Sequence, residues 1–362
     1  MVLADRVLMG PGPSNPYPEV VGALTRPMLG HLDPEFLEVL DETCARLRRV
    51  FRCANPLTFP LSGTGSAGME ASLVNFLGPG DVAVVGVNGL FGERLCEVAA
   101  RAGAEVVRVE APWGTPIDPE ALTAAHAAPT VIAVVHAETS TGVRNDVEEV
   151  ARHKGDALVV VDAVTSLGGI PVEVDAWGLD IVYSGTQKCL GVPPGLAPLT
   201  VGERARRRLR PRPASWYLDL TLIGRYVEGQ GQRTYHHTAP VSMVFALHAG
   251  LGALLDEGLE AAWRRHGECG LALQSGLEKL GLELVAPPGH RLPQLTTVWV
   301  PDDVPVPEAE VRSRLLADYG IEIGAGVGPM AGKAWRIGCM GHSARLRNVA
   351  LLLGALGEVL GR

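Results

Sequence analysis

Apolar and polar positions along the first part of the chain follow a pattern that predicts a mostly parallel sheet covered by helices. Between about residues 60 and 202, short runs rich in Val and Ile are separated by stretches whose apolar residues recur at helical intervals. Gly103 and Gly155 stand where two of these helices would end. The pattern predicts an α/β fold with a three-layer α/β/α large domain. We expect strands at residues 82–87, 131–135, 158–161 and 181–183, and helices at 91–102, 119–126 and 147–153.

After Pro240 the pattern changes to that of a smaller α+β unit. A long helical pattern runs from residue 241 to about 280, with glycines such as Gly258 as possible breaks. It is followed by a strand at 295–300, a helix at 307–319, a strand at 335–337 and a final helix from Ser343. We therefore expect an N-terminal segment at 1–20 that contributes to the ligand site, a large domain at 21–255 and a small C-terminal domain at 256–362.

Composition and charge limit the classes of partner. The chain has 362 residues, 47% of them hydrophobic, which is enough for two domains with separate cores. The formal net charge is −8 and the basic residues are scattered, so we do not expect nucleic acid as a partner. One basic run, from Arg204 to Arg212, is the exception, and we interpret it as a solvated helix face.

Cysteines and apolar segments indicate the compartment. The six cysteines show no paired spacing, which argues against a disulfide framework and a zinc site. The first residues lack a signal-peptide pattern, and no segment is apolar over the length that crosses a bilayer. We expect a cytoplasmic protein that holds no metal and does not bind membranes.

A glycine-rich stretch provides the first candidate for ligand binding. Residues 62–68 read Ser-Gly-Thr-Gly-Ser-Ala-Gly and lead into an amphipathic segment. Glycines let the backbone approach an anion, and a helix N-terminus presents free N–H groups with positive partial charge. The stretch lacks the dinucleotide and P-loop fingerprints, and an ordinary turn before a helix is the alternative. It predicts a phosphate cradle.

Two charged residues follow predicted strands. Asp162 ends an apolar run, where side chains of α/β sheets face the ligand crevice, and its carboxylate could pair with a protonated pyridine nitrogen. Capping of the next turn is the alternative role. Lys188 follows the strand at 181–183 in a loop bounded by Gly and Pro. Desolvation and a neighbouring cation would lower its pKa and favour imine formation, whereas a solvated surface lysine is the alternative.

Together these motifs resemble the class V, fold-type I aminotransferases, and among them the alanine–glyoxylate / serine–pyruvate aminotransferase group. The resemblance spans nearly the whole chain. Besides residues 62–68 and the strand to Asp162, it rests on Gly-Pro-Gly-Pro-Ser-Asn at 10–15, Ser-Gly-Thr-Gln-Lys at 184–188 and Tyr-His-His-Thr at 235–238. It implies pyridoxal 5′-phosphate (PLP) as cofactor, a small amino acid and a 2-oxo acid as substrates, and a homodimer with shared active sites.

The resemblance also implies a role for individual residues. Lys188 would attach the cofactor as a Schiff base and shuttle a proton, and Asp162 would bind the pyridine nitrogen. Arg336 would bind the substrate carboxylate, with help from the backbone near Gly12. The remaining cofactor contacts would come from Thr64, Gly65, Ser66 and Gln187 at the phosphate, Thr139 at the ring hydroxyl, Phe91 on the ring face, and Tyr235 and Thr238 from the partner subunit.

Two positions depart from the family pattern. Phe91 stands where tryptophan is common, and Ser66 stands where some relatives carry histidine. Other conspicuous residues have simpler interpretations. Adjacent His236 and His237 would point in opposite directions in an extended segment, so they do not indicate a metal site. Cysteines near the proposed site, Cys189 and Cys339, are interpreted as buried apolar residues.

Several other functions remain as alternatives. Cysteine desulfurase shares the fold type, but residues 324–328 contain no cysteine and Phe91 replaces the usual histidine. Phosphoserine aminotransferase should show further cations for the substrate phosphate, and we find none to assign. A catalytically silent protein on the same scaffold would not need Lys188, Asp162 and Arg336 together. We expect a transaminase that uses alanine or serine as donor and glyoxylate or pyruvate as acceptor.

Overall fold

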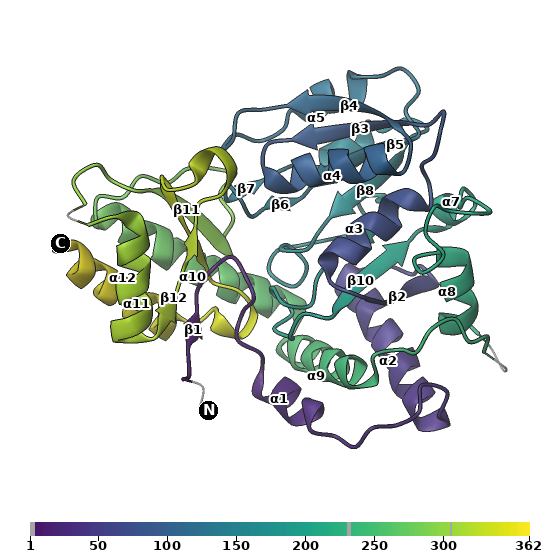
Figure 1. The fold of residues 1–362 in the computed structure, drawn as a ribbon, viewed down its shortest axis with the longest axis horizontal. Coiled ribbons are helices and arrows are strands. Elements are labelled where there is room, and N and C mark those ends of the chain that lie inside the picture. Colours follow the sequence, from purple (N-terminus) through teal and green to yellow (C-terminus); the bar gives the residue numbers. More distant parts are fainter. Residues whose placement is uncertain (1–3, 230–232, 305) are drawn as a thin grey trace.

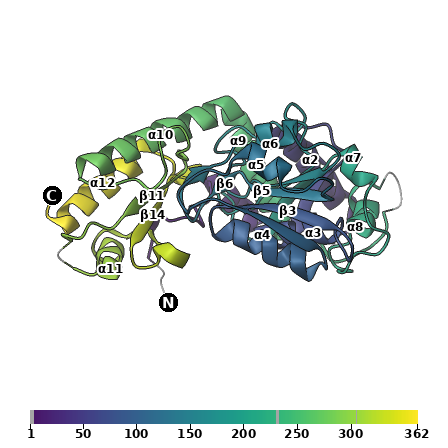
Figure 2. The same cartoon turned by 90° about the horizontal axis from the view of Figure 1, so that it is seen from above.

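The computed structural model describes residues 4–229, 233–304 and 306–362, and the chain forms two parts of unequal size (Figure 1). The larger part holds a broad sheet with helices around it. The smaller part contains the C-terminal helices and a short sheet, against which the N-terminal strand lies. Seen from above, the two parts lie next to each other along the length of the molecule (Figure 2).

A sheet of seven strands forms the centre of the larger part, in the order β2-β10-β9-β8-β5-β3-β4. All neighbouring strands are parallel except where β10 pairs with β2 and β9. This mostly parallel sheet confirms the predicted α/β class. The strands are β2 (Leu57–Ser62), β3 (Val82–Val87), β4 (Glu105–Glu110), β5 (Val131–Val135), β8 (Leu158–Asp162), β9 (Ile181–Tyr183) and β10 (Leu196–Val201).

Helices cover both faces of this sheet and complete the three predicted layers. Figure 2 shows α3 and α4 on one face and α5 and α6 on the other. Aspartates begin several helices, since the side chains of Asp33, Asp118, Asp146 and Asp219 accept N–H groups of the first turns of α2, α5, α6 and α8. The helices are α1 (Pro18–Leu24), α2 (Pro34–Phe51), α3 (Gly65–Val74), α4 (Leu90–Arg101), α5 (Pro119–Ala124), α6 (Val147–Arg152), α7 (Glu203–Arg206) and α8 (Leu220–Val227).

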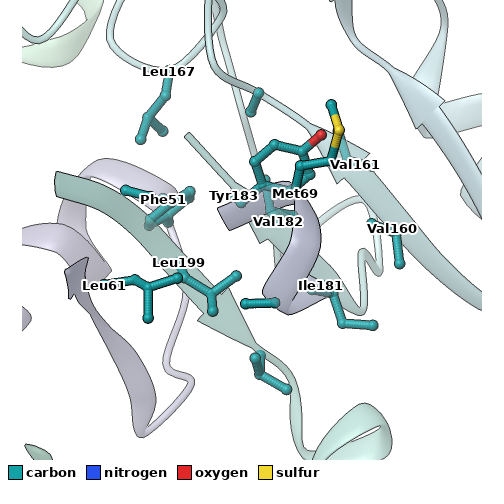
Figure 3. Packing of buried hydrophobic residues seen from close by; sticks show 14 of the residues in the cluster. Phe51, Leu61, Met69, Val160, Val161, Leu167, Ile181, Val182, Tyr183 and Leu199 are labelled. Carbon is teal, nitrogen blue, oxygen red and sulfur yellow. The ribbon is translucent and has the colours of Figure 1, made fainter. Parts of the chain in front are cut away.

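Burial on both faces explains why the central strands are unbroken apolar runs. Val161 of β8 and Val182 and Tyr183 of β9 are fully buried. Figure 3 shows these side chains close to Met69 of α3, which covers this part of the sheet. A parallel sheet covered on both faces leaves no polar side to its strands, so the sequence shows no alternation there.

The four strands predicted for the larger part are confirmed to within one residue, but the other three strands of its sheet were not predicted. Strands β2 and β10 each contain a proline, and Pro60 lies opposite Pro198 in their antiparallel pair. A proline normally argues against a strand in a sheet interior, so the sequence pattern was ambiguous. Strand β4 lies at the sheet edge, and its charged residues alternate with half-buried valines.

The long helical pattern after residue 240 is two helices, α9 (Val241–Glu257) and α10 (Leu259–Lys279). Gly258 separates them with a φ of 88°, a conformation that favours glycine, and it was one of the predicted breaks. Figure 1 places α9 under the larger part, whereas α10 belongs to the smaller part. No helix within the described ranges is both long and apolar enough to cross a membrane.

The smaller part is an α+β unit, as predicted. Its sheet has the order β11-β14-β13, and β1 pairs with β12 in parallel beside it. Its core contains Met9 together with Trp335 and Ile337, so the N-terminal segment packs into the C-terminal unit. The predicted boundaries at 1–20, 21–255 and 256–362 stay predictions. The elements are β1 (Val7–Leu8), β11 (Leu295–Trp299), α11 (Glu308–Tyr319), β12 (Ile321–Glu322), β13 (Gly324–Ala325), β14 (Ala334–Gly338) and α12 (Leu346–Leu360).

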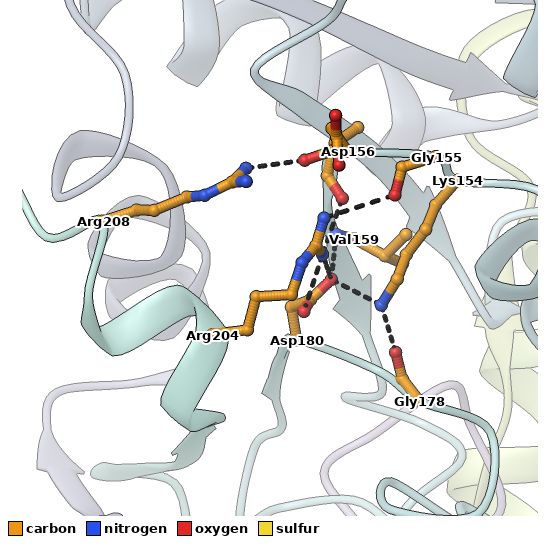
Figure 4. Close-up of polar contacts among 9 residues, drawn as sticks. Lys154, Gly155, Asp156, Val159, Gly178, Asp180, Arg204 and Arg208 are labelled. Carbon is orange, nitrogen blue, oxygen red and sulfur yellow. Dashed lines mark hydrogen bonds and ion pairs between the residues drawn. The ribbon is translucent and has the colours of Figure 1, made fainter.

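The basic run from Arg204 to Arg212 is not simply a solvated helix face. Helix α7 is only four residues long, and Arg204 reaches the buried carboxylate of Asp180 at 2.9 Å. Figure 4 shows this carboxylate between Arg204 and Lys154 at the start of β8 and β9. Arg206 and Arg210 likewise pair with acidic residues distant in sequence. The sequence interpretation was wrong for these three arginines because their partners come from other elements.

Candidate active site

A cavity of about 200 Å³ gathers most of the residues predicted to carry chemistry. It lies where β8 and β9 end and where α3 and α4 begin, the edge at which open α/β sheets bind ligands. Met69, Arg94 and Val164 belong to it without having been predicted. The full lining is Thr64, Gly65, Ser66, Met69, Phe91, Arg94, Asp162, Val164, Gln187 and Lys188.

A larger groove of about 610 Å³ lies elsewhere, between α1, α2 and α9. Its lining includes none of the predicted site residues, and it is open to solvent along exposed charged side chains such as Arg49 and Arg345. The smaller cavity is the better candidate because it combines a buried amine with a buried carboxylate.

Lys188 lies in the loop after β9 and is 9% exposed. Its Nζ donates a hydrogen bond to the carbonyl oxygen of Pro11. Burial lowers the pKa of Lys188 to about 8, and the charge of Arg336 acts in the same direction. A substantial fraction of the amine is therefore neutral near pH 8, and the neutral amine is the nucleophilic form.

Gly12 forms the wall behind this lysine. Its φ is 110°, a conformation that favours glycine. A Cβ at this position would lie 2.5 Å from the Nζ of Lys188, so no side chain fits there. The next segment is also fixed, because the hydroxyl of Ser14 donates to the carbonyl oxygen of Lys188 at 2.7 Å. The backbone of the N-terminal segment thus lies against Lys188, and its contribution to the active site stays a prediction.

Asp162 is 3% exposed at the end of β8. Its Oδ2 accepts a hydrogen bond from the hydroxyl of Tyr183 at 2.7 Å, and its Oδ1 accepts the backbone N–H of Val164 at 2.9 Å. Burial raises the pKa of Asp162, and the two hydrogen bonds oppose this rise because they favour the charged form. The carboxylate both fixes the following turn and faces the cavity.

The start of α3, which is the predicted phosphate cradle, lies at the cavity. The preceding residue, Thr64, makes no side-chain cap, and the first turn contains no acidic residue. Thr64, Gly65 and Ser66 line the cavity, so the positive end of the helix dipole lies beside it. The Oε1 atom of Gln187, at the other side of the cavity, is buried and has no hydrogen-bond partner among the described residues. Such an unsatisfied group suits a site that is completed by a ligand.

Phe91 is the second residue of α4 and is half-buried at the cavity. The guanidinium of Arg94, one helical turn later, lies 5.0 Å from the centre of its ring. The backbone N–H of Phe91 donates to Oε2 of Glu138 at 3.2 Å. The ring of Phe91 thus lies against a cation of the same helix, and its backbone is held by a carboxylate from β6 (Ala137–Glu138).

Arg336 comes from β14 of the smaller part and does not line the 200 Å³ cavity itself. Its Nε donates to the carbonyl oxygen of Ala325 at 2.7 Å, and its Nη1 lies 3.5 Å from the carbonyl oxygen of Thr139. The pKa of Arg336 is lowered by burial, which makes an anionic partner favourable. The contact also places Thr139, which is buried, next to the guanidinium.

Tyr235 and Thr238 lie outside this cavity. Tyr235 is 56% exposed, and its hydroxyl is 3.5 Å from that of Thr238, which is also exposed. The prediction that His236 and His237 point in opposite directions is wrong. Their Nδ1 atoms are 2.8 Å apart, because the chain bends at His237 instead of continuing as a strand.

Three functional candidates were missed by the sequence reasoning. Tyr183 lies directly opposite Asp162 in the parallel β8–β9 pair, and a tyrosine at the end of the neighbouring strand was the available signal. Arg94 follows Phe91 at a helical spacing of three. Glu138 directly precedes Thr139, so its neighbour in the sequence was the available signal.

These groups fit PLP. A phosphate suits the start of α3, a protonated pyridine nitrogen suits Asp162, an aromatic ring suits the face of Phe91, and an aldehyde suits the amine of Lys188. Each of these four features lies at the same cavity. The fit rests on the donors and acceptors of the chain itself.

Comparisons with known proteins agree on one family. A family model described as aminotransferase class-V matches residues 14–334. An alanine–glyoxylate aminotransferase from Drosophila melanogaster is 38% identical over 370 residues, which cover 99% of this chain and 93% of that protein. The structure of an alanine–glyoxylate aminotransferase from Nostoc sp. has a TM-score of 0.94 at 45% identity, covering 99% of this chain and 96% of that one. The structure of a ureidoglycine–glyoxylate aminotransferase from Bacillus subtilis has a TM-score of 0.95 at 39% identity, covering 100% and 94%.

The similarity therefore extends over both parts of the molecule and over the segments that form the cavity. It confirms the resemblance first noted in the motifs at residues 10–15, 62–68 and 184–188. The enzymatic class and the cofactor follow from the same findings. The chain belongs to the class V aminotransferases, enzymes that depend on PLP.

Proposed function

We propose that this aminotransferase moves the amino group of a small neutral amino acid, alanine or serine, to glyoxylate or pyruvate. The observation that carries the proposal is that one guanidinium, that of Arg336, lies close enough to the buried amine of Lys188 for its charge to lower the pKa of that amine. The names of the relatives from Drosophila melanogaster and Nostoc sp. support alanine and glyoxylate.

When bound, PLP supplies an electron sink that stabilises negative charge developing at the Cα of the amino acid. The role we assign to Asp162 is to keep the ring nitrogen protonated, because its carboxylate is held by Tyr183 and Val164 and faces the cavity. Thr64, Gly65 and Ser66 would bind the phosphate, together with Gln187. Phe91 would lie against the ring, and Thr139 would contact its hydroxyl.

Lys188 would carry the proton between substrate atoms. Its Nζ has a pKa of about 8 because the side chain is buried and because Arg336 repels the ammonium form. A pKa close to the operating pH lets the same amine accept and return a proton. The wall formed by Pro11 and Gly12 would keep this amine from turning away from the cavity and would exclude water behind it.

Arg336 would bind the carboxylate that every α-amino acid and 2-oxo acid carries. Among the described residues its Nη2 atom has no hydrogen-bond partner, so a carboxylate can be accepted there. A dicarboxylic donor would bring a second charge, and burying it without a cation costs several kcal/mol.

Arg94 is a second cation in this region, because it lines the cavity. We assign Arg94 to the cofactor side, since its guanidinium lies over the ring of Phe91. Its charge also acts on Asp162, which holds the pyridine end of the proposed site. The substrate side would thus keep Arg336 as its carboxylate partner, and neutral donors remain favoured.

The active unit would be a homodimer in which Tyr235 and Thr238 complete the neighbour's phosphate site. Both side chains are exposed and neither lines the chain's own cavity, which supports this assignment. Two exposed aromatic side chains lie beside this segment in space, since Trp216 stacks on His236 and Tyr217 lies next to His237. The hydroxyl of Tyr217 donates to Ser62 at 2.9 Å, at the edge of the phosphate loop. A mixture of Lys188→Ala with a Tyr235/Thr238 double variant should regain activity through hybrid dimers, and a fully active monomer would contradict the arrangement.

A cytoplasmic location remains our proposal. The cysteines of the described ranges are free, and most of them are buried. Free thiols are typical of proteins from reducing compartments. Neither a nucleic acid nor a membrane is part of the proposed activity.

Donor half-reactions measured by stopped-flow absorbance would test the function. Alanine and serine should transfer their amino group to the bound cofactor much faster than aspartate and glutamate. The aminated cofactor should then pass the amino group fastest to glyoxylate or pyruvate. (S)-Ureidoglycine belongs in the same series because the Bacillus subtilis relative is named for it. A clear preference for aspartate or glutamate would overturn the proposal, and a preference for ureidoglycine would replace the donor while keeping the acceptor.

A further inference from the structure

Glu138 is a fully buried carboxylate that the proposed chemistry does not use. It ends the short strand β6, and none of its surface is exposed. Burial raises the pKa of Glu138 to about 7, although several hydrogen bonds act in the opposite direction. A carboxylate that is costly to bury needs a specific set of donors, and this one has them.

The donors come from the start of α4 and from Ser140. Oε2 accepts the backbone N–H groups of Phe91 at 3.2 Å and Gly92 at 3.4 Å. Oε1 accepts the backbone N–H of Ser140 at 3.0 Å and its hydroxyl at 2.6 Å. The same hydroxyl oxygen accepts the N–H of Leu90 at 3.0 Å. The first three N–H groups of α4 are thus bound by a segment about fifty residues away in sequence.

Gly89 explains why this helix is capped from a distance. It occupies the N-cap position and has no side chain to supply an acceptor. A Cβ at Gly89 would lie 2.3 Å from the Oγ of Ser140 and 2.4 Å from the Cδ of Glu138. The space that a normal capping residue would need is filled by the two residues that replace it.

The same carboxylate connects three groups of the proposed site. It holds the backbone of Phe91, whose ring faces the cavity. It directly precedes Thr139, whose carbonyl oxygen faces the Nη1 of Arg336 at 3.5 Å. The charges of Glu138 and Arg336 also act on each other. A shift of this carboxylate would therefore displace the aromatic platform and the substrate clamp together.

We propose that Glu138 is a positioning residue that holds Phe91, Thr139 and Arg336 in one fixed arrangement around the cavity. The inference rests on the functions proposed above for these three residues. Glu138 itself would contact neither the cofactor nor the substrate. Its effect would pass through the N-terminus of α4 and through the β6 segment.

The variant Glu138→Gln separates positioning from stability. The amide keeps the size of the side chain, but its NH₂ group must face one of the two donor pairs, which strands those donors. Loss of the buried charge relieves a desolvation cost at the same time. These effects on stability oppose each other, so we expect the melting temperature to change by only a few degrees. One of the two donor pairs, however, loses its acceptor and must move.

Three measurements and a second variant would test the proposal. In Glu138→Gln we expect kcat/KM for the donor to fall by about 10- to 100-fold, mostly through kcat. The visible circular dichroism of bound PLP should change, because the platform under the ring has moved. Hydrogen exchange at residues 90–93 should accelerate in the cofactor-free protein. Ser140→Ala, which removes one donor and the acceptor of Leu90, should cause a smaller change of the same kind.

The matched control is Glu93→Gln, in the same helical turn. Glu93 is a half-exposed carboxylate that pairs with Arg108 at 2.8 Å on the solvent side. We expect its kcat/KM to stay within about twofold of the wild type. Equal effects of Glu93→Gln and Glu138→Gln would overturn the proposal.

Two further outcomes would also overturn it. The first is that dichroism and kcat/KM stay unchanged in Glu138→Gln, even with a lower melting temperature, because the carboxylate would then only hold the helix. The second applies if Glu138→Gln does not fold: wild-type dichroism and turnover in Ser140→Ala would then overturn the proposal. A wild-type protein that shows neither a PLP signal nor turnover would instead contradict the proposed function, and hydrogen exchange in the cofactor-free variants would still decide the role of Glu138.

Discussion

Replacing Asp180 by alanine should destabilise the larger part of the molecule without altering the cavity. The Asp180 side chain is 5% exposed and accepts the Nζ of Lys154 at 2.8 Å and the Nη1 of Arg204 at 2.9 Å (Figure 4). It also accepts the backbone N–H of Val159 at 2.9 Å. One carboxylate therefore ties β8, the residue before β9 and helix α7 together, at the sheet edge away from Asp162.

The magnitude follows from what the substitution leaves behind. Lys154 and Arg204 are 16% and 31% exposed, so both would keep a partly buried charge without its carboxylate. Breaking such a pair costs about 3–5 kcal/mol. Arg204 retains the carbonyl oxygen of Ala157 at 2.9 Å, so we expect the lower end, about 3 kcal/mol. For a chain of 362 residues that corresponds to a fall in Tm of about 4 °C.

Calorimetry of the cofactor-free protein at one fixed concentration would measure this change, because assembly and ligands also shift Tm. Asp156→Ala is the control, since it removes an exposed carboxylate from the loop that contains Lys154 and should leave Tm nearly unchanged. Adding Lys154→Met to Asp180→Ala should recover part of the loss, because one stranded charge is removed. A Tm of Asp180→Ala equal to that of the control would refute the reasoning.

The site itself allows three shorter predictions. Lys188→Ala should abolish turnover while the protein folds, and borohydride followed by mass spectrometry should label Lys188 in the wild type; a label on another lysine would contradict the assignment. Tyr183→Phe removes a hydrogen bond that lowers the pKa of Asp162, so the acid limb of the pH–rate profile should move to higher pH. The rate of PLP attachment to the cofactor-free enzyme should rise with pH through about 8, where Lys188 loses its proton, and this midpoint should move upward in Arg336→Gln because a charge that lowers the pKa is gone.

Local sequence patterns were sufficient for the centre of the fold. Strands β3, β5, β8 and β9 were predicted because a sheet covered on both faces demands unbroken apolar runs. Strands β2 and β10 were missed because each contains a proline. A single sequence does not reveal that Pro60 and Pro198 face each other, since this depends on antiparallel pairing between distant segments.

The same distinction applies to the site. Thr64, Asp162 and Lys188 lie at ends of elements, where the pattern of the fold alone brings them to one edge. The residues that support them were not predicted. Tyr183 became visible once the register of β8 and β9 was known, and Glu138 required the contact between β6 and α4. Supporting contacts of this kind depend on tertiary packing, which leaves no periodic signal in the sequence.

The N-terminal segment links the two parts of the enzyme in a way that makes two binding events interdependent. Strand β1 pairs with β12, and the carbonyl oxygen of Met9 accepts the N–H of Gly338, two residues from Arg336. Two residues further on, Pro11 and Gly12 touch Lys188 of the larger part. Any ligand that displaces the smaller part through Arg336 must also alter the surroundings of the lysine. If binding of a carboxylate changes the proton affinity of Lys188 by some factor, protonation of Lys188 must change the affinity for the carboxylate by that same factor.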